Sequence, residues 1–135
     1  KCAQLSLPEM KIGMIPGSGG SVRLARMIGL SRVKDMIMRG KRISGEEAFN
    51  WGLASELVEK DKLEITISKL VDELCSVSPL AQRAIKTVLN TSQDAPLHVA
   101  IELEGETYGR LRSSDDFNEG VKSFVEKRKP VYKGN

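Results

Sequence analysis

The sequence predicts an α/β protein, and more narrowly the second half of an α/β domain. Up to about residue 58, short stretches of extended pattern alternate with turns that contain glycine and proline. From residue 61 onward, apolar residues recur at helical spacing with few breaks. No internal repeat or low-complexity linker separates the two parts. We therefore expect short strands and turns up to about residue 58 and a mostly helical region after it.

Extended segments are expected near the start of the chain. Residues 2–7 alternate apolar and polar side chains, the period of a strand, and Pro8 ends that strand because it has no N–H to donate. Residues 12–15 are expected to form a second extended piece before the turn dipeptide Pro16-Gly17. A weaker strand pattern covers residues 53–58.

Helices are expected wherever a capping residue precedes an apolar pattern. Ser31 and Ser78 are expected N-caps, Pro79 fits the first helical position, and Ser44 with Glu47 forms a capping box. Glycines, and finally Pro130, end the helices. The expected helices cover residues 22–28, 32–39, 45–51, 61–75, 79–90, 96–112 and about 113–129, and residues 131–135 are expected to be a tail.

The composition is that of a globular domain and argues against several other classes. A net charge of +3 is too small to indicate nucleic acid, although it fits a polyanionic small ligand. The few aromatic residues form no base-stacking platform, and a lone His98 builds no His/Cys metal cluster. No run is long and apolar enough to predict a membrane span. Cys2 and Cys75 lie far apart, so we expect reduced intracellular thiols, with Cys75 buried.

One carboxylate lies close to a turn rich in glycine. Glu9 precedes the segment Pro16-Gly-Ser-Gly-Gly20 by a few residues, and residues 21–28 behind it have helical character. Such an arrangement places a proton-transfer group beside exposed backbone N–H donors. On composition alone, the alternative that Glu9 is a surface acid beside a flexible helix entrance stays open.

A series of short motifs resembles the enoyl-CoA hydratase/isomerase (crotonase-like) family. In order they are Pro8-Glu9, Ile12-Gly13, Ile15-Pro16-Gly17-x-Gly19-Gly20, Arg23-Leu24, Arg42-Ile43-Ser44-x-x-x-Ala48, Gly52-Leu53-Ala54, Val58, Asp116 to Gly120, Phe124, Glu126-Lys127-Arg128 and Tyr132-Lys133. They run over essentially the whole chain but match only the carboxy-terminal half of a family member.

The resemblance implies a fold, an assembly and a substrate class. It implies a spiral of ββα turns, with residues 1–75 as the carboxy-terminal part of that core and residues 76–135 as a helical trimerisation region. Family members form homo-trimers, often paired into hexamers. Their substrates are acyl-CoA thioesters, so coenzyme A arrives with the substrate and no separate cofactor or metal is expected. The mitochondrial matrix or the cytoplasm is the expected location.

The resemblance also assigns roles to single residues. Glu9 matches the glutamate that exchanges the proton at C2 of the acyl chain. Pro16 and Gly17 are expected to lend backbone to the pocket for the water or acyl group, and Met14 is expected to touch the acyl chain. Phe124 and Lys127 match positions of the last helix that contact CoA. For Lys127 the alternative stays open that, like Arg128 and Lys129, it only complements the helix dipole.

Hydration of a 2-enoyl-CoA is the function we expect. The oxyanion-hole N–H groups and the second glutamate of hydratases are expected in a missing amino-terminal half, on the same or a separate chain. The alternatives are an enoyl-CoA isomerase of the same fold and an oligomerisation fragment without catalysis. RNA binding is a weaker alternative, because no lysine-rich comb is visible.

Overall fold

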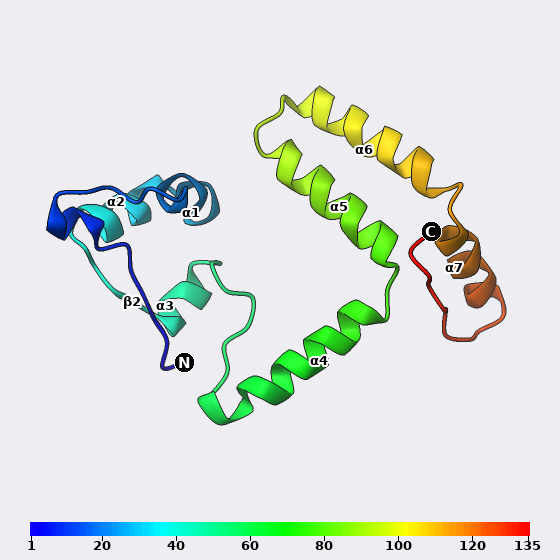
Figure 1. Cartoon of the computed structure of the whole chain (residues 1–135), viewed down its shortest axis with the longest axis horizontal. Coiled ribbons are helices and arrows are strands. Elements are labelled where there is room, and N and C mark those ends of the chain that lie inside the picture. Colours follow the sequence, from blue (N-terminus) through cyan, green and yellow to red (C-terminus); the bar gives the residue numbers. More distant parts are fainter. The chain divides into compact units, whose positions relative to one another are not determined.

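Two compact units make up the chain, whose computed structural model describes residues 1–135 (Figure 1). The first unit is Lys1–Thr66 and the second is Ile67–Asn135. Their boundary falls inside helix α4 (Leu63–Cys75). The boundary at residue 75, which was drawn between a spiral core and a trimerisation region, stays a prediction.

Short elements dominate the first unit. They are β1 (Gln4–Leu5), the 3-10 helix η1 (Glu9–Ile12), α1 (Gly20–Ile28), α2 (Leu30–Met38), β2 (Ile43–Ser44), α3 (Gly45–Asn50) and the 3-10 helix η2 (Lys60–Lys62). Strands β1 and β2 pair antiparallel, with Gln4 opposite Ser44 and Leu5 opposite Ile43. The strand expected over residues 2–7 is therefore confirmed, although it is shorter.

Two expected strands are wrong. No strand forms over residues 12–15: η1 ends at Ile12, Gly13 is a turn, and Met14 and Ile15 are irregular. No strand forms over residues 53–58 either. Periodicity over four to six residues does not distinguish a strand from a turn, and these residues find no neighbouring strand to pair with. The consequence for the site is that Glu9 begins a helical turn.

The predicted capping box of α3 is confirmed. The Glu47 N–H donates to Ser44 Oγ at 3.0 Å, and the Ser44 N–H donates to Glu47 Oε2 at 2.9 Å. The Ser44 N–H and then the Lys41 ammonium lower the pKa of Glu47. Gly52 follows the helix with φ 77°, the left-handed conformation expected there. The predicted cap at Ser31 is wrong, because α2 begins at Leu30, two residues before the expected start, and Gly29 is its N-cap residue.

The core of the first unit is small and centred on α2. Ile28, Val33 and Ile37 form one buried cluster. Met36, Ile43 and Ala48 form a second, in which Ile43 is fully buried. Trp51 packs against both clusters, with the Arg32 and Lys41 side chains over its ring. Helix α2 also packs against η1 and against α1, so this core supports the part of the chain that contains Glu9.

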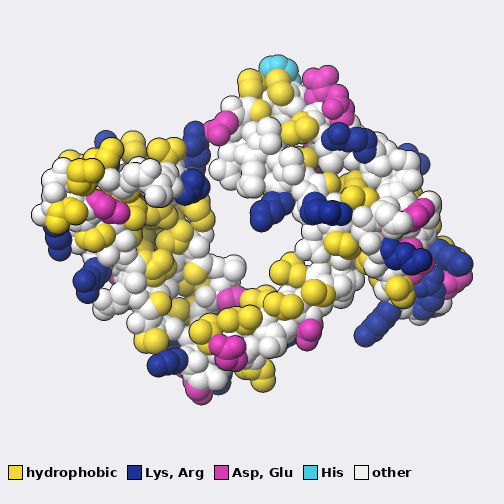
Figure 2. All heavy atoms as spheres, viewed as in Figure 1, with side chains coloured by type: hydrophobic (Ala, Val, Ile, Leu, Met, Phe, Trp, Pro, Cys, Tyr) yellow, Lys and Arg dark blue, Asp and Glu magenta, His cyan; other side chains and the backbone are white.

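Helices make up the second unit, and little of their apolar surface is covered. Helix α5 (Pro79–Ser92) packs beside α6 (Leu97–Leu111), and α7 (Asp115–Val125) follows. Val88 is the one buried hydrophobic residue of this unit, and neither α4 nor α6 has a buried residue. Hydrophobic side chains lie open along α4 (Figure 2). The expectation that Cys75 is buried is wrong, because this end of α4 is exposed.

No helix of the chain combines the length and the apolar character needed to cross a membrane.

Candidate functional site

Glu9 carries an unusual carboxylate. It is half-buried at the first position of η1, and its Oε2 atom is buried without a hydrogen bond from the chain. It is the one buried side-chain oxygen or nitrogen in this condition. Buried polar atoms are almost always paired, so an exception points to a role outside the fold's own hydrogen bonds.

The turn of η1 holds Glu9 rigidly. Its carbonyl accepts a hydrogen bond from the Met14 N–H at 3.1 Å, and Gly13 ends the short helix. Helix η1 packs against α2, and the Lys11 side chain lies against buried Gly40 at the end of α2. The Met14 side chain, in contrast, is 60% exposed. Backbone from Glu9 to Met14 is therefore fixed, while the Met14 side chain is free to meet a ligand.

The glycine-rich loop, residues 16–20, is anchored at both ends and open in the middle. Pro16 is buried, and it lies with Leu7 against Gly20 at the start of α1. Gly19 has φ 78°, which favours glycine, and the Arg23 guanidinium donates to the Ser18 carbonyl at 2.5 Å. Among the glycines of this loop, only Gly17 has neither a positive φ nor a close neighbour: a Cβ there would meet no atom within 4 Å.

This part of the first unit can therefore offer two chemical functions. The Glu9 carboxyl can exchange a proton with a reacting atom. The exposed loop at Gly17, beside a helix α1 whose first turn has no side-chain cap, can bring backbone close to a ligand. Glu9, Met14, Pro16 and Gly17 all lie in the first unit, and their roles in a site stay predictions.

A second group of predicted residues lies at the end of α7. Phe124 is 85% exposed and borders an apolar pocket of about 450 Å³. The Lys127 N–H donates to the Phe124 carbonyl and the Arg128 N–H to the Ser123 carbonyl, which is the Schellman pattern. Lys127 occupies its left-handed position with φ 52°, the one non-glycine residue of the chain with a positive φ. Such a conformation costs a side-chain-bearing residue about 1–2 kcal/mol.

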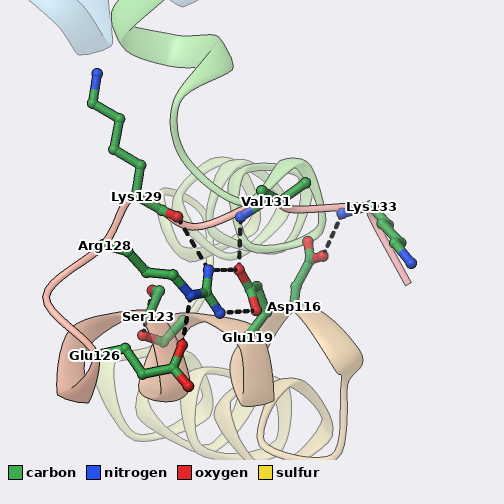
Figure 3. Close-up of polar contacts among 9 residues, drawn as sticks. Asp116, Glu119, Ser123, Glu126, Arg128, Lys129, Val131 and Lys133 are labelled. Carbon is green, nitrogen blue, oxygen red and sulfur yellow. Dashed lines mark hydrogen bonds and ion pairs between the residues drawn. The ribbon is translucent and has the colours of Figure 1, made fainter.

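Arg128 is held by carboxylates. Its Nη1 and Nη2 donate to Glu119 at 2.6 and 2.8 Å, and its Nε donates to Glu126 at 2.6 Å (Figure 3). Hydrogen bonds from Arg128 and from the Val131 N–H lower the pKa of Glu119 to about 2. Arg128 thus uses most of its N–H groups in contacts within the chain.

Asp116 joins three parts of the second unit. This buried carboxylate accepts hydrogen bonds from Ser78 Oγ at 2.6 Å, the Lys133 N–H at 2.8 Å and the Gly134 N–H at 3.0 Å. The Ser78 hydroxyl, with these N–H groups, lowers the pKa of Asp116. The expected irregular tail is consequently pinned along α7, and we refer to residues 128–135 as the tail segment (Figure 1).

Sequence reasoning did not find these structural roles of Asp116, Glu119 and Arg128. A signal was available, because Asp116 and Glu119 are three residues apart and share one face of a helix. Nothing local showed, however, that Asp116 would bind Ser78, that Glu119 would bind Arg128, or that both would accept backbone N–H groups of the tail segment.

The family follows from comparison with known proteins. The enoyl-CoA hydratase/isomerase family profile matches residues 1–135. The chain belongs to this family. A curated relative, methylglutaconyl-CoA hydratase 1, mitochondrial, from Pyricularia oryzae, is 38% identical over 98% of the chain and 42% of its own length. Carnitinyl-CoA dehydratase from Salmonella typhi is 35% identical over 98% of the chain and 52% of its own length.

Solved structures confirm the crotonase-like fold. The crystal structure of enoyl-CoA hydratase from Bacillus anthracis has a TM-score of 0.94 and 36% identity, over 98% of the chain and 52% of that protein. An enoyl-CoA hydratase/isomerase from Mycobacterium paratuberculosis has a TM-score of 0.92 at 32% identity. The chain spans about half the length of the curated relatives it matches. That it is the carboxy-terminal half stays a prediction.

Proposed function

We propose that the chain is part of an enoyl-CoA hydratase in which Glu9 transfers the proton at C2. The observation that carries the proposal is the buried Glu9 Oε2, which accepts no hydrogen bond from the chain although η1 holds its backbone in place. A carboxyl group without an internal partner is available to a reacting substrate. The names of the two curated relatives, a hydratase and a dehydratase, support addition or removal of water.

The proposed reaction adds water across the double bond of a 2-enoyl-CoA. The water oxygen bonds to C3, and the π electrons move toward the thioester oxygen as an enolate. Protonated Glu9 then gives its proton to C2, and the proton lost by the water restores the acid. Charge on the enolate oxygen requires preorganised N–H donors. We place these donors, and the second glutamate, in the part of the relatives that the chain does not span.

The loop and Met14 would form one wall of the acyl site. Gly17 has no packing role for its missing side chain, so its backbone is open to close approach by the thioester or the water. Buried Pro16 keeps that backbone in place, and exposed Met14 provides a flexible apolar contact for the acyl chain.

Phe124 and Lys127 would bind the nucleotide end of CoA. An exposed aromatic ring can stack on a base, and an ammonium group pairs with phosphate oxygens. The two residues are joined by the hydrogen bond from the Lys127 N–H to the Phe124 carbonyl at 3.3 Å. CoA would be carried by the substrate, so the reaction needs no separate cofactor.

We further propose a homo-trimer or hexamer and an intracellular location. The uncovered apolar faces of α4 and α6 are of the kind that oligomers bury. The name of the Pyricularia oryzae relative includes mitochondrial, which supports the mitochondrial matrix as one location.

The test is a Glu9→Gln substitution in the full-length protein that contains this chain. Loss of the enone-thioester absorbance of crotonyl-CoA measures hydration. We expect kcat to fall by about 10²–10⁴, because the amide cannot exchange the proton. Glu56→Gln, at an exposed glutamate of the same unit, is the control and should retain full activity.

Two results would overturn this proposal. Full activity of the Glu9→Gln protein would remove Glu9 from the mechanism. Conversion of a 3-enoyl-CoA to a 2-enoyl-CoA without hydration would replace the hydratase by the isomerase alternative.

A further inference from the structure

The backbone at Lys127 needs an explanation that its own side chain does not provide. Lys127 lies at the left-handed position of the Schellman motif, where glycine is the usual residue. A residue with a Cβ persists there when surrounding contacts determine its conformation. The two backbone hydrogen bonds of the motif, to Phe124 and Ser123, are common to helices that end in glycine.

The residues on both sides of Lys127 are tied to each other. Arg128 Nε donates to Glu126 Oε2 at 2.6 Å, which closes a small loop around Lys127. The same guanidinium makes a bidentate ion pair with Glu119, which lies in α7. Glu119 in turn accepts the Val131 N–H at 2.8 Å. Figure 3 shows Arg128 between Glu119 and Glu126. Because Glu126 and Arg128 are bound to each other and Arg128 is bound to α7, the residues on both sides of Lys127 are held in place.

Arg128 itself has little capacity left for a ligand. Besides Glu119 and Glu126, its Nη1 donates to the Lys129 carbonyl at 3.1 Å. Two carboxylates surround its single positive charge, whereas Lys127 has no ion pair in the chain. Lys127, like Lys129, is thus a cation without an ion pair, and it is the one that lies between the Arg128 and Glu126 contacts.

We propose that Arg128, with Glu119 and Glu126, is a positioning residue for Lys127. By holding Lys127 in its left-handed conformation, Arg128 fixes the start of the ammonium-bearing side chain relative to the Phe124 ring. The ligand is the phosphate-bearing nucleotide part of CoA, and the inference rests on the proposed function. Arg128 affects affinity for this part of the substrate through Lys127 and does not contact the reacting atoms.

The experiment compares two substrates in the full-length protein. Crotonyl-CoA contains the nucleotide, and crotonyl-pantetheine has the same reacting group without it. We expect Arg128→Ala to raise KM for crotonyl-CoA about two- to fivefold, the size of a surface charge contact, with kcat unchanged. Its kinetics with crotonyl-pantetheine should equal those of the parent. Arg128→Lys keeps the charge without the two-pronged geometry and should give an intermediate KM.

A second variant separates positioning from general stability. In a Lys127→Gly background, Arg128→Ala should cause no further rise in KM for crotonyl-CoA, because the positioned ammonium is gone. Equal losses with both substrates, or additive effects of the two substitutions, would overturn the proposal. If Arg128→Ala does not fold, Glu126→Gln weakens the contact between Glu126 and Arg128 instead. KM for crotonyl-CoA should then rise while KM for crotonyl-pantetheine stays constant, and equal rises would overturn the proposal.

Failure of the proposed function can be recognised separately. Calorimetric titration with CoA alone needs no turnover. If the parent binds CoA and Arg128→Ala weakens that binding while neither protein hydrates crotonyl-CoA, the hydratase assignment fails and the positioning role stands. If the parent does not bind CoA, the positioning role is wrong.

Discussion

Replacing Lys127 by glycine should stabilise the protein and weaken its binding of CoA. With φ at 52°, Lys127 has a backbone conformation that costs a residue with a Cβ about 1–2 kcal/mol. Glycine removes this cost but gives the unfolded chain about 0.4–1 kcal/mol more conformational entropy. The matched control is Lys127→Ala, which loses the same ammonium and keeps the strain. We therefore expect the glycine variant to be about 1 kcal/mol more stable than the alanine variant.

Urea unfolding at one fixed protein concentration measures the stability difference, and titration with CoA measures binding. Both variants should bind CoA about two- to fivefold more weakly than the parent, since each loses the same exposed cation. A glycine variant no more stable than the alanine variant would show that position 127 is not left-handed. Unchanged CoA affinity in both would show that Lys127 only complements the helix dipole, the alternative that the sequence leaves open.

Three further substitutions test other parts of the structure. Ser44→Ala removes the N-cap of α3 and should lower the free energy of unfolding by about 1 kcal/mol without changing kcat. A fall in kcat would contradict a purely structural role for Ser44. Gly17→Ala adds a methyl group where no atom lies within 4 Å, so the urea midpoint should stay constant while KM rises; an equal KM would remove Gly17 from the acyl site. The pKa of Glu119 is lowered from 4.5 to about 2, so its stabilising effect is present above pH 4.5 and is lost as the pH falls toward 2. In the Glu119→Gln protein, the urea midpoint should therefore change less between pH 4.5 and pH 2 than it does in the parent. An equal change in the two proteins would contradict this account.

Local sequence signals predicted the elements that depend on neighbouring residues. The capping box of Ser44 and Glu47, the Pro79 start of α5 and the glycine after α3 all appear in the structure. Each works through contacts within about one helical turn, so a short stretch of sequence contains all the information. The resemblance of the motifs likewise predicted the crotonase-like fold that the solved structures confirm.

Features that depend on distant contacts could not be predicted in the same way. The Glu9 backbone was expected near an extended segment, yet it starts a 3-10 turn that packs against α2. Cys75 was expected in a core, but α4 presents its apolar stripe to solvent in the chain. An apolar pattern shows which face a helix is prepared to bury, and it does not show whether the covering surface is part of the same chain.

The way α7 holds the tail segment limits which sequences the segment can tolerate. Glu119 and Asp116 bind the N–H groups of Val131, Lys133 and Gly134, and not their side chains. The side chains at positions 131 and 133 are therefore open to exchange for most others, but proline is forbidden there because it has no N–H. Apart from Arg128, whose side chain is bound, this part of the segment is therefore constrained by its backbone and not by the identity of its side chains.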